Sequence, residues 1–515
     1  MKLQSNILKL ALFATGLSGI VAEYVLSTLA TYFLGDSVFQ WTMIVSIMLF
    51  SMGLGSRFSK YFSNNLLQKF ILIEFILSIL TAYVSVITYS VSAYYGNSYL
   101  IIYSLSIIIG LLIGMEIPIV IRLNNQFEKL HVNVSSVMEN DYYGSLVGGV
   151  FFAFIGLPYL GLTYTPIILG SINFSVAIGL YFLLKSALEK RQKFRINLLS
   201  LCVMLLLVSG FVFARPIISY GEERRYRDKV VYEEQSKYQK IVITQSKEDF
   251  WLFINGNQQL SSIDEVMYHE PLVHPVMRAL KNPTDILIMG GGDGGAVREI
   301  LKYPSVKNIT LVDLDPAMTA LGQNHELLVE MNHNSMNHNK LAIINEDGYN
   351  FLEDHNEYYD AIIIDLPDPK TVEIGRLYSY EFYKLCHKRL RPHGLVITQA
   401  GSPYYAARAF NCIDKTMTAA GFATVPLHNQ VITLGEWGWV LGAKNGDGNQ
   451  LKTSLQQLQF ENPKIETRWI NHDAMTLITS FGKELFEDDT VNIEVNKIHN
   501  PVLYKYYLDG NWDVY

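Results

Sequence analysis

Seven long apolar runs occupy most of the first 214 residues, and they limit the fold more than any other feature of the chain. They lie near residues 7–34, 38–56, 70–95, 99–121, 144–160, 163–184 and 197–214. A helix needs about twenty mostly apolar residues to cross the hydrocarbon core of a bilayer. The first run is too long, and the pattern repeats too often, for a cleaved signal peptide. The sequence therefore predicts a multi-pass helical membrane domain over residues 1–214, with the lipid bilayer as its partner.

Basic residues gather in alternate connections between these runs. They occur near 2–9, 57–69, 122–129 and 185–195, whereas the intervening turns contain none. The positive-inside rule places such connections, and the N-terminus with them, in the cytoplasm. Seven spans would then leave the rest of the chain outside. However, basic residues that favour the inside also follow the last run, namely Arg215, Arg224, Arg225, Arg227 and Lys229. We expect a protein of the cell membrane whose C-terminal part is cytoplasmic, which requires one run to be re-entrant or split.

Ionisable residues within or beside the runs allow two interpretations. They are Glu23, Glu74, Glu116, Arg122, Glu139 and Asp141. Charge inside a membrane is costly and usually faces a bundle interior or a polar cavity. In one interpretation these residues form a polar site, such as a path for an amine. In the other, Glu116 pairs with Arg122 and the remaining acids lie at the membrane interface.

Residues 215–515 have the composition of a soluble protein. The first 214 residues carry 12 Lys and Arg against 8 Asp and Glu, and subtraction from the totals of 41 and 48 leaves 29 basic and 40 acidic residues. An acidic half without basic runs argues against nucleic acid as a partner and fits a cationic substrate better. The three cysteines are isolated, and the absence of a Cys/His cluster predicts that no metal is bound.

The soluble part divides further by pattern. Partial alternation with an NGN turn predicts a small β domain over residues 215–282. From residue 285 apolar strands alternate with helices, which predicts a parallel, doubly wound, Rossmann-like α/β domain over 283–445. Residues 446–515 are left as a C-terminal extension. The predicted fold class is thus a multi-span α-helical membrane domain, a small β domain and a Rossmann-like domain.

The stretch DILIMGGGDGGAVREI, residues 285–300, carries a glycine loop between a strand and a helix. Its glycines are Gly290, Gly291, Gly292, Gly294 and Gly295. Their G-x-G-x-x-G spacing alone suits a dinucleotide equally well. Asp313, at the end of the next strand, is placed to accept hydrogen bonds from ribose hydroxyls. Asp347-Gly348 ends the third strand, where the carboxylate would accept from an adenine amino group. Together these residues predict an adenosine pocket.

Three further acids predict the charge of the ligand. Asp293 lies within the loop, and Asp365 and Asp368 end the fourth strand in DAIIIDLPDP. Carboxylates repel phosphate, so a pyrophosphate is not expected beside them. The predicted ligand is an adenosine that carries positive charge, such as a sulfonium nucleoside with an amine tail. The alternative is that Asp293 only caps the following helix, and the two other acids at the same edge favour binding.

Six stretches occur in one order: YQKIVI, LFINGNQQLSSIDEVMYHEPLVHP, ILIMGGGDGGAVREILKYPSVKNITLVDLD, EDGYNFL, YDAIIIDLPDP and LYSYEFYKLCHKRLRPHGLVITQAGSP. They resemble the spermidine/spermine synthase family, the polyamine aminopropyltransferases. The resemblance covers about residues 230–445 and implies an α/β domain of the methyltransferase type. In the N-terminal part, GLLIGMEIP and ENDYYGSLVGG resemble the membrane-embedded bacterial branch of this family.

The resemblance implies a reaction and residue roles. The aminopropyl group of decarboxylated S-adenosylmethionine, a co-substrate rather than a bound cofactor, would pass to an amine such as putrescine, with release of methylthioadenosine. The donor site would include Gln239, Gln259, Asp313, Asp347 and Gly348, and Asp293 would hold the aminopropyl ammonium. The attacking amine would be surrounded by Tyr268, His269 and Asp365, with Asp368 as support. Residues 369–379 resemble the family's gating loop.

The reaction requires that the amine nitrogen and the carbon be aligned, and it requires a general base. The sulfonium is already a good leaving group, so alignment of nitrogen and carbon matters most. An alkylamine with a pKa of about 10 is almost entirely ammonium at pH 7. A carboxylate must therefore bind it and accept a proton, and Asp365, aided by the Tyr268 hydroxyl, is the predicted base. At about 4 Å and an effective dielectric near ~20, Asp293 would repel the carboxylate of intact S-adenosylmethionine by ~4 kcal/mol.

Simpler roles remain for single residues: Tyr268 as a core aromatic, His269 bonded to a backbone carbonyl, and Gln239 exposed on a strand. The segment PLHNQVITLGEWGWVLGAK departs from the Tyr-Pro-containing strand of soluble members, which leaves the acceptor amine open. His428, Glu436 and Trp437 lie in this segment.

Two other functions stay open. The first is an S-adenosylmethionine-dependent methyltransferase, and the second is a polyamine transporter or sensor whose soluble part only binds. Soluble members of the family imply a homodimer.

Overall fold

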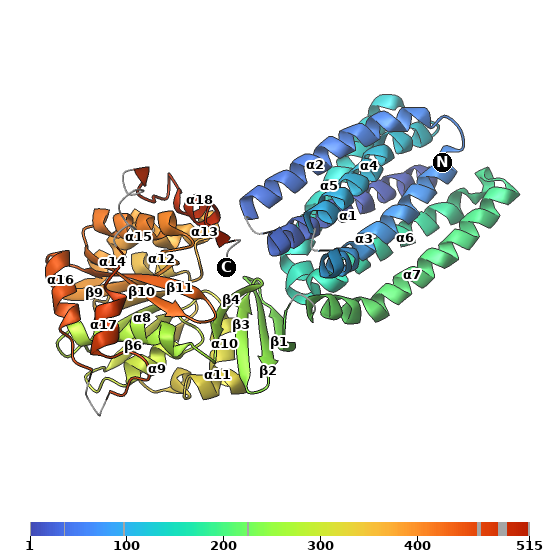
Figure 1. Cartoon of the computed structure of the whole chain (residues 1–515). Helices are drawn as coiled ribbons and strands as arrows, with labels where there is room; N and C mark the ends of the chain where they lie inside the picture. The colour runs from blue at the N-terminus through green and yellow to red at the C-terminus, as the bar shows by residue number, and fades with distance from the viewer. Residues whose placement is uncertain are drawn as a thin grey trace. The chain divides into compact units, whose positions relative to one another are not determined.

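Figure 1 shows a computed structural model of the chain, which describes residues 2–34, 37–95, 98–223, 226–460, 465–482 and 492–512. The chain forms two compact units, residues 1–229 and 230–515. The predicted domain boundaries after residues 214, 282 and 445 stay predictions. Arg224 and Arg225, two of the basic residues noted after the last apolar run, lie outside the described residues.

The N-terminal unit is helical. Its helices are α1 (Lys2–Leu34), α2 (Ser37–Phe58), α3 (Leu66–Tyr95), α4 (Ser98–Asn124), α5 (Leu130–Phe151), α6 (Gly161–Leu184) and α7 (Lys190–Glu223), with a π-helical segment, η2 (Phe152–Leu160), between α5 and α6 and short 3₁₀ turns at Ser59–Tyr61 and Lys185–Ala187. By length and composition, six helical stretches of the described residues are able to cross a membrane, where the sequence predicts seven runs. The difference arises because the backbone stays helical through η2, which joins two of the predicted runs into one stretch of 58 residues.

Helix α5 lies directly against α1 and runs parallel to it. Gly144 faces Phe13, and Gly148, one turn later, faces Leu17. A Cβ atom at Gly144 would lie 2.0 Å from the carbonyl oxygen of Phe13, so the two backbones touch. Small residues spaced four apart are typical of helix pairs in membranes, where lipid supplies no hydrophobic drive and close packing replaces it.

Helix α6 runs antiparallel to α1. The hydroxyl of Ser18 donates to the side-chain oxygen of Asn173 at 2.9 Å. Gly179, further along α6, lies beside Ile7, which is nearer the start of α1. The chain therefore reverses between α5 and α6, at Gly161 with its φ of 61°. The long fifth stretch is thus two helices of opposite direction, as the two separate apolar runs predict.

Four acidic side chains among the described residues are buried inside the N-terminal unit. Glu23 of α1, Glu74 of α3, Glu116 of α4 and Asp141 of α5 are 8%, 1%, 0% and 8% exposed. The predicted pair between Glu116 and Arg122 is not formed, because the guanidinium donates to three backbone carbonyl groups instead. These acids lie in the interior of the helical unit, whereas Glu139 of α5 is exposed. The polar site and the position at a membrane interface both stay predictions.

The C-terminal unit contains two sheets. The four-stranded sheet has the order β1-β2-β3-β4, with β1 (Lys229–Gln235), β2 (Lys240–Ser246), β3 (Asp249–Ile254) and β4 (Asn257–Ser261). The seven-stranded sheet has the order β10-β11-β9-β8-β5-β6-β7. Its strands are β5 (Asp285–Gly290), β6 (Asn308–Val312), β7 (Leu341–Ile344), β8 (Tyr359–Asp365), β9 (Leu390–Gly401), β10 (Ala423–Val431) and β11 (Gly435–Ala443).

Strands β5 to β9 pair in parallel, and β10 and β11 extend one edge as an antiparallel pair. The predicted Rossmann-like sheet is confirmed. Helices flank it (Figure 1): α8 (Val266–Ala279), α9 (Gly295–Leu301), α10 (Pro316–Asn324), α11 (Glu326–Met331), α12 (Gly348–Asp354), α13 (Val372–Gly375), α14 (Tyr380–Arg389), α15 (Ala407–Ala419), α16 (Gly448–Gln456), α17 (His472–Ile478) and α18 (Leu503–Leu508), with 3₁₀ turns at Ser335–Asn337 and Arg376–Tyr378.

Strand β5 illustrates why the polar groups of this unit gather at the strand ends. Ile286 and Ile288 pack into one core, Leu287 and Met289 pack into another on the opposite face, and all four are essentially unexposed. A parallel strand that is covered on both faces has no room for polar side chains along its length. Functional side chains are therefore confined to the carboxyl ends of the strands.

The C-terminal extension packs onto the same unit through a buried carboxylate. Glu270 of α8 accepts hydrogen bonds from the backbone N–H groups of Arg468, Trp469 and Ile470 at 2.6, 2.8 and 2.8 Å. The Glu270 side chain is unexposed. The extension is thus tied to the helix that also carries Tyr268 and His269.

Replacement of this carboxylate should loosen the extension. We expect Glu270→Ala to lower the free energy of unfolding by about 3 kcal/mol, because three backbone N–H groups lose their acceptor. Thermal unfolding of the full chain in detergent, followed by circular dichroism, measures the effect. Glu466→Ala, which removes an exposed carboxylate from the same segment, serves as the control. Equal unfolding temperatures for the two variants would contradict the assigned role.

Candidate active site

A cavity of about 420 Å³ opens at the carboxyl ends of the central strands. Among the residues predicted to bind or react, the following line it: Gln239, Gln259, Tyr268, His269, Gly290, Gly291, Gly292, Asp293, Asp313, Asp347, Gly348, Asp365 and Asp368. Gly294 and Gly295 are not among the lining residues and instead shape the loop. The cavity thus brings together residues from the four-stranded sheet, α8 and four strands of the larger sheet.

The loop needs glycine because its backbone lies very close to neighbouring elements. Gly290 has a φ of 80°, and a Cβ atom there would lie 2.1 Å from the carbonyl oxygen of Asp365. A Cβ atom at Gly295 would lie 2.3 Å from the imidazole ring of His269. Glycine therefore allows the loop to touch both β8 and α8, which draws the acids of different strands to one point.

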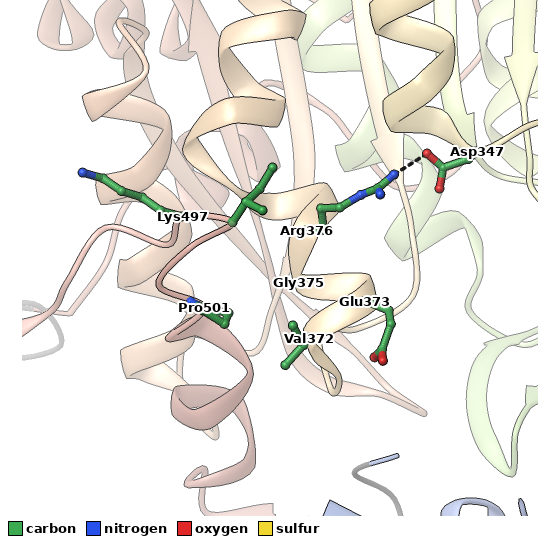
Figure 2. Close-up of a pocket in the computed structure, with 8 residues that line it drawn as sticks. Asp347, Val372, Glu373, Gly375, Arg376, Lys497 and Pro501 are labelled. Atoms are coloured by element: carbon green, nitrogen blue, oxygen red, sulfur yellow. Dashed lines mark hydrogen bonds and ion pairs between the residues drawn. The ribbon is translucent and has the colours of Figure 1, made fainter. Parts of the chain in front are cut away.

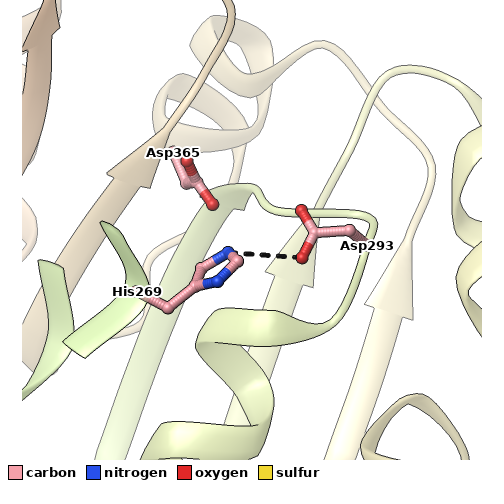
Figure 3. Close-up of side chains that lie close together, drawn as sticks. All are labelled: His269, Asp293 and Asp365. Carbon is pink, nitrogen blue, oxygen red and sulfur yellow. Dashed lines mark ion pairs between the residues drawn. The ribbon is translucent and has the colours of Figure 1, made fainter. Parts of the chain in front are cut away.

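Asp293 has two partners. Its Oδ1 accepts from the backbone N–H of Gly295 at 2.7 Å, at the start of α9. The same oxygen lies 3.4 Å from Nε2 of His269, as Figure 3 shows. The predicted helix cap and the predicted contact with the cavity are therefore both present, and the side chain keeps 13% of its surface exposed toward the cavity it lines.

His269 is held between carboxylates. Its Nδ1 lies 2.8 Å from Glu265, whose two oxygens accept from Arg298 at 2.9 and 2.8 Å. Burial by itself would lower the pKa of His269, but Asp293 and Glu265 outweigh it and raise the pKa to about 10. The ring is thus a cation at neutral pH. The alternative of a bond to a backbone carbonyl is wrong.

Asp365 lies next to this group. The Tyr268 hydroxyl donates to its Oδ1 at 2.7 Å. Burial, and then the charge of Asp293, raise the pKa of Asp365 to about 6. Burial also raises the pKa of Tyr268 well above its usual value, so the phenol remains a donor. Tyr268 is therefore more than a core aromatic, and Asp365 is a carboxylate that can take up a proton near neutral pH.

Asp368 follows Asp365 by three residues, in the loop after β8. Its Oδ2 accepts from the hydroxyl of Tyr507 at 2.7 Å and lies 3.7 Å from Nζ of Lys370. Lys370 also donates to Asn257 at 2.8 Å. This carboxylate is thus oriented by a residue of the C-terminal extension.

Asp313 and Asp347 lie at the end of the cavity that is predicted to bind adenosine. Burial raises the pKa of Asp313 to about 6, although the backbone N–H of Asp315 donates to it at 2.9 Å. Asp347 accepts from two backbone N–H groups at the start of α12 and from Arg376 at 2.5 Å. Figure 2 shows Arg376 reaching Asp347 from the predicted gating loop, beside Lys497 and Pro501. The predicted gating loop is thus bonded to Asp347 at this end of the cavity.

Two groups of side chains within the described residues come within metal-binding reach: His269, Asp293 and Asp365, and Glu270, His274 and Glu299. In the first group a protonated His269 has no lone pair to offer. In the second, Glu270 is occupied by backbone N–H groups and Glu299 pairs with Arg298 and Lys302. Both groups fit ion pairs better than a metal, and the expectation that no metal is bound stays a prediction.

The sequence did not indicate several residues that contact the site. Glu265 lies four residues before His269, so its spacing on a helix would have indicated the pair. Arg376 and Tyr507 carry no such local signal. Trp437 lines the cavity and is 7% exposed, whereas His428 and Glu436 bond to each other. Gln239 lies in the turn before β2 and faces the cavity, so the exposed-strand alternative is wrong.

Known proteins resemble this chain over nearly its full length. A model of the spermine/spermidine synthase domain matches residues 265–454. Polyamine aminopropyltransferase 2 of Aquifex aeolicus is 41% identical over 506 residues, which cover 98% of each chain. This chain belongs to the polyamine aminopropyltransferase family. The polyamine aminopropyltransferase of Oceanobacillus iheyensis is 35% identical over 518 residues, 99% of this chain and 98% of that one.

Among solved structures, spermidine synthase from Thermotoga maritima is 25% identical, with a TM-score of 0.44, over 49% of this chain and 85% of that one. Membership of the polyamine aminopropyltransferase family confirms the predicted activity. The enzyme transfers the aminopropyl group of decarboxylated S-adenosylmethionine, its co-substrate, to an amine.

The charge of His269 can be tested directly. We expect its pKa to fall by at least ~1 unit in Asp293→Asn, because one of the two stabilising carboxylates is lost. Histidine-selective NMR titration measures this, with Asp509→Asn, an exposed site, as the control. Because folding raises the pKa from 6.5 to about 10, the stability that His269 contributes is fully present below pH 6.5 and is lost as the pH rises toward 10. A wild-type pKa near 6.5 would contradict the ion pairs.

Proposed function

We propose that the cavity binds decarboxylated S-adenosylmethionine and a diamine such as putrescine together, with Asp365 as the base. The surroundings of the Asp365 carboxylate are the main observation in support of this proposal. It is hydrogen-bonded by Tyr268, lies beside Asp293 and has a pKa of about 6. A group with a pKa near the working pH is the most effective proton acceptor.

The adenosine of the donor is proposed to lie between Asp313, which would bind the ribose hydroxyls, and Asp347, which would bind the adenine amino group. Gln239, Gln259 and Gly348 border the same region. The sulfonium and the aminopropyl ammonium then lie toward Asp293. With Glu265, Asp293 and Asp365 ionised and His269 and Arg298 protonated, this cluster keeps one net negative charge, which favours a cationic ligand.

The proposed reaction joins the amine nitrogen to the carbon next to sulfur while the carbon–sulfur bond breaks and its electrons pass to sulfur. An ammonium of pKa about 10 gives up its proton to a carboxylate of pKa about 6 at a cost of ~5 kcal/mol. Burial lowers this cost, because desolvation reduces the pKa of an ammonium. Tyr268 holds one oxygen of Asp365 and leaves the other for the amine.

Removal of the base tests this proposal. Asp365→Asn should reduce kcat at least ~100-fold, as expected for loss of a general base, while methylthioadenosine binds within about threefold of wild type. Product formation by mass spectrometry and calorimetric binding measure the two effects, with the exposed Asp354→Asn as the control. In the wild type kcat/KM should rise with pH through about 6, since Asp365 must be ionised. Normal turnover of Asp365→Asn would show that the base is another group.

The N-terminal unit is proposed to cross the cell membrane, with the catalytic unit in the cytoplasm. Large apolar side chains stay exposed along α7, and Leu198, Leu205 and Val212, spaced seven apart, are 54%, 59% and 59% exposed. An apolar stripe of this kind suits contact with lipid. The basic residues after α7 favour the cytoplasmic side for the C-terminal unit.

The helices α1 to α7 are joined by short connections, so they would cross alternately and place the two ends of the unit on opposite faces. A cytoplasmic catalytic unit then requires an outer N-terminus, although the basic connections near 57–69 and 185–195 favour the reverse. We expect the protein to resist extraction by alkaline carbonate. A C-terminal fluorescent-protein fusion should fluoresce, and a C-terminal alkaline phosphatase fusion should be inactive. The opposite pair of reporter signals would place the catalytic unit outside. The homodimer stays a prediction.

A further inference from the structure

We infer that the C-terminal segment 492–512 completes the acceptor site, with Tyr507 as the residue that positions Asp368 for the far ammonium group of a diamine. This rests on the proposed roles of the cavity residues. The segment lies beyond the synthase domain, whose match ends at residue 454. The Tyr507 hydroxyl donates to Oδ2 of Asp368 at 2.7 Å, and Tyr507 is 2% exposed.

The position of the Tyr507 hydroxyl is set by its surroundings. The ring lies against Gly401 at the end of β9, where a Cβ atom would be 3.4 Å from it and where φ is 69°. The Trp512 ring packs against the Tyr507 ring at a tilt of 32°, with 4.7 Å between ring centroids, and its indole N–H donates to the Tyr507 carbonyl at 2.7 Å. The backbone N–H of Asn511 donates to the carbonyl of Tyr405 at 2.7 Å. The hydroxyl therefore reaches Asp368 from a fixed support.

The same segment holds the end of the predicted gating loop. The Asn496 amide donates to the carbonyls of Gly375 and Tyr378 at 2.9 and 3.2 Å, and its backbone carbonyl accepts from Tyr380 at 2.8 Å. Its side-chain oxygen accepts from the backbone N–H groups that begin α18. Figure 2 shows Lys497 and Pro501 of this segment beside the loop. One asparagine thus connects the loop to the helix that carries Tyr507.

Tyr268, Asp365 and Asp368 line the cavity, and Tyr507 bonds Asp368 from behind this lining. Two similar pairs result, Tyr268 with Asp365 and Tyr507 with Asp368, each joined at 2.7 Å. In each pair the hydroxyl occupies one carboxylate oxygen and orients the other. The two aspartates are three residues apart, which limits their backbones to a separation of about 10 Å. That range suits the two nitrogens of a short diamine. Lys370, 3.7 Å from Asp368, supplies the positive charge at the far position when no diamine is bound.

A comparison of two amines tests this role. In full-length Tyr507→Phe, the KM for 1,4-diaminobutane should rise about tenfold, the loss expected for one hydrogen bond to a charged group, with kcat within twofold. The KM for decarboxylated S-adenosylmethionine should not change. The affinity for n-butylamine, measured as substrate or competitive inhibitor, should also not change, because this amine has no second ammonium. Asp368→Asn should likewise raise the KM for 1,4-diaminobutane, and the double variant should lose little more than Asp368→Asn alone.

Tyr506→Phe is the matched control, because Tyr506 lies on the same helix and its hydroxyl accepts only from the backbone of Glu494 among the bonds described here. It should behave as wild type with both amines. Equal losses for the diamine and n-butylamine in Tyr507→Phe, or no loss for either, would overturn the inference. A wild-type enzyme that releases no methylthioadenosine with the diamine would overturn the proposed function, and the inference with it.

Discussion

A buried carboxylate remains charged only beside a cation or a set of hydrogen-bond donors, and the catalytic unit is organised around this constraint. Arg298 neutralises Glu265, and a protonated His269 bridges Glu265 and Asp293. Asp365 lies beside this group and forms no ion pair with a cation among the described residues, so burial and the charge of Asp293 raise its pKa to about 6. The arrangement keeps one carboxylate available to a cationic substrate while the others are balanced. A carboxyl group of intermediate pKa follows from this order of charges.

The central sheet explains why these groups meet at one point. Its parallel strands are apolar on both faces, so acids that belong to different strands lie at their carboxyl ends. Glycine at positions 290 and 295 then removes the atoms that would hold the loop away from Asp365 and His269. The site is therefore a consequence of close backbone packing as much as of the acids themselves. Substitution of either glycine would separate charges that need to be near each other.

The parts outside the matched synthase domain are built by the same physical rules. The buried carboxylate of Glu270 binds the C-terminal extension, and Tyr507 of that extension donates a hydrogen bond to Asp368, which lines the cavity. In the N-terminal unit, glycine again allows helix backbones to touch, and Glu74, Glu116 and Asp141 face the interior. Neither carboxylate oxygen of Glu116 has a hydrogen-bond partner among the described residues. Both units thus carry buried acids, and among the described residues Glu74 accepts from Thr15 at 3.4 Å whereas Asp365 accepts from Tyr268 at 2.7 Å.

The sequence by itself determined the apolar helices, the alternation of strand and helix, the glycine loop and the acids at strand ends, because each follows from a local pattern. The family resemblance extended this to the reaction and to most residues that line the cavity. Only the tertiary structure decided the partners: Arg122 binds carbonyls rather than Glu116, Arg376 reaches Asp347, and Tyr507 bonds Asp368 from 139 residues away. Such contacts depend on how whole elements pack, and no local pattern in the chain encodes that packing.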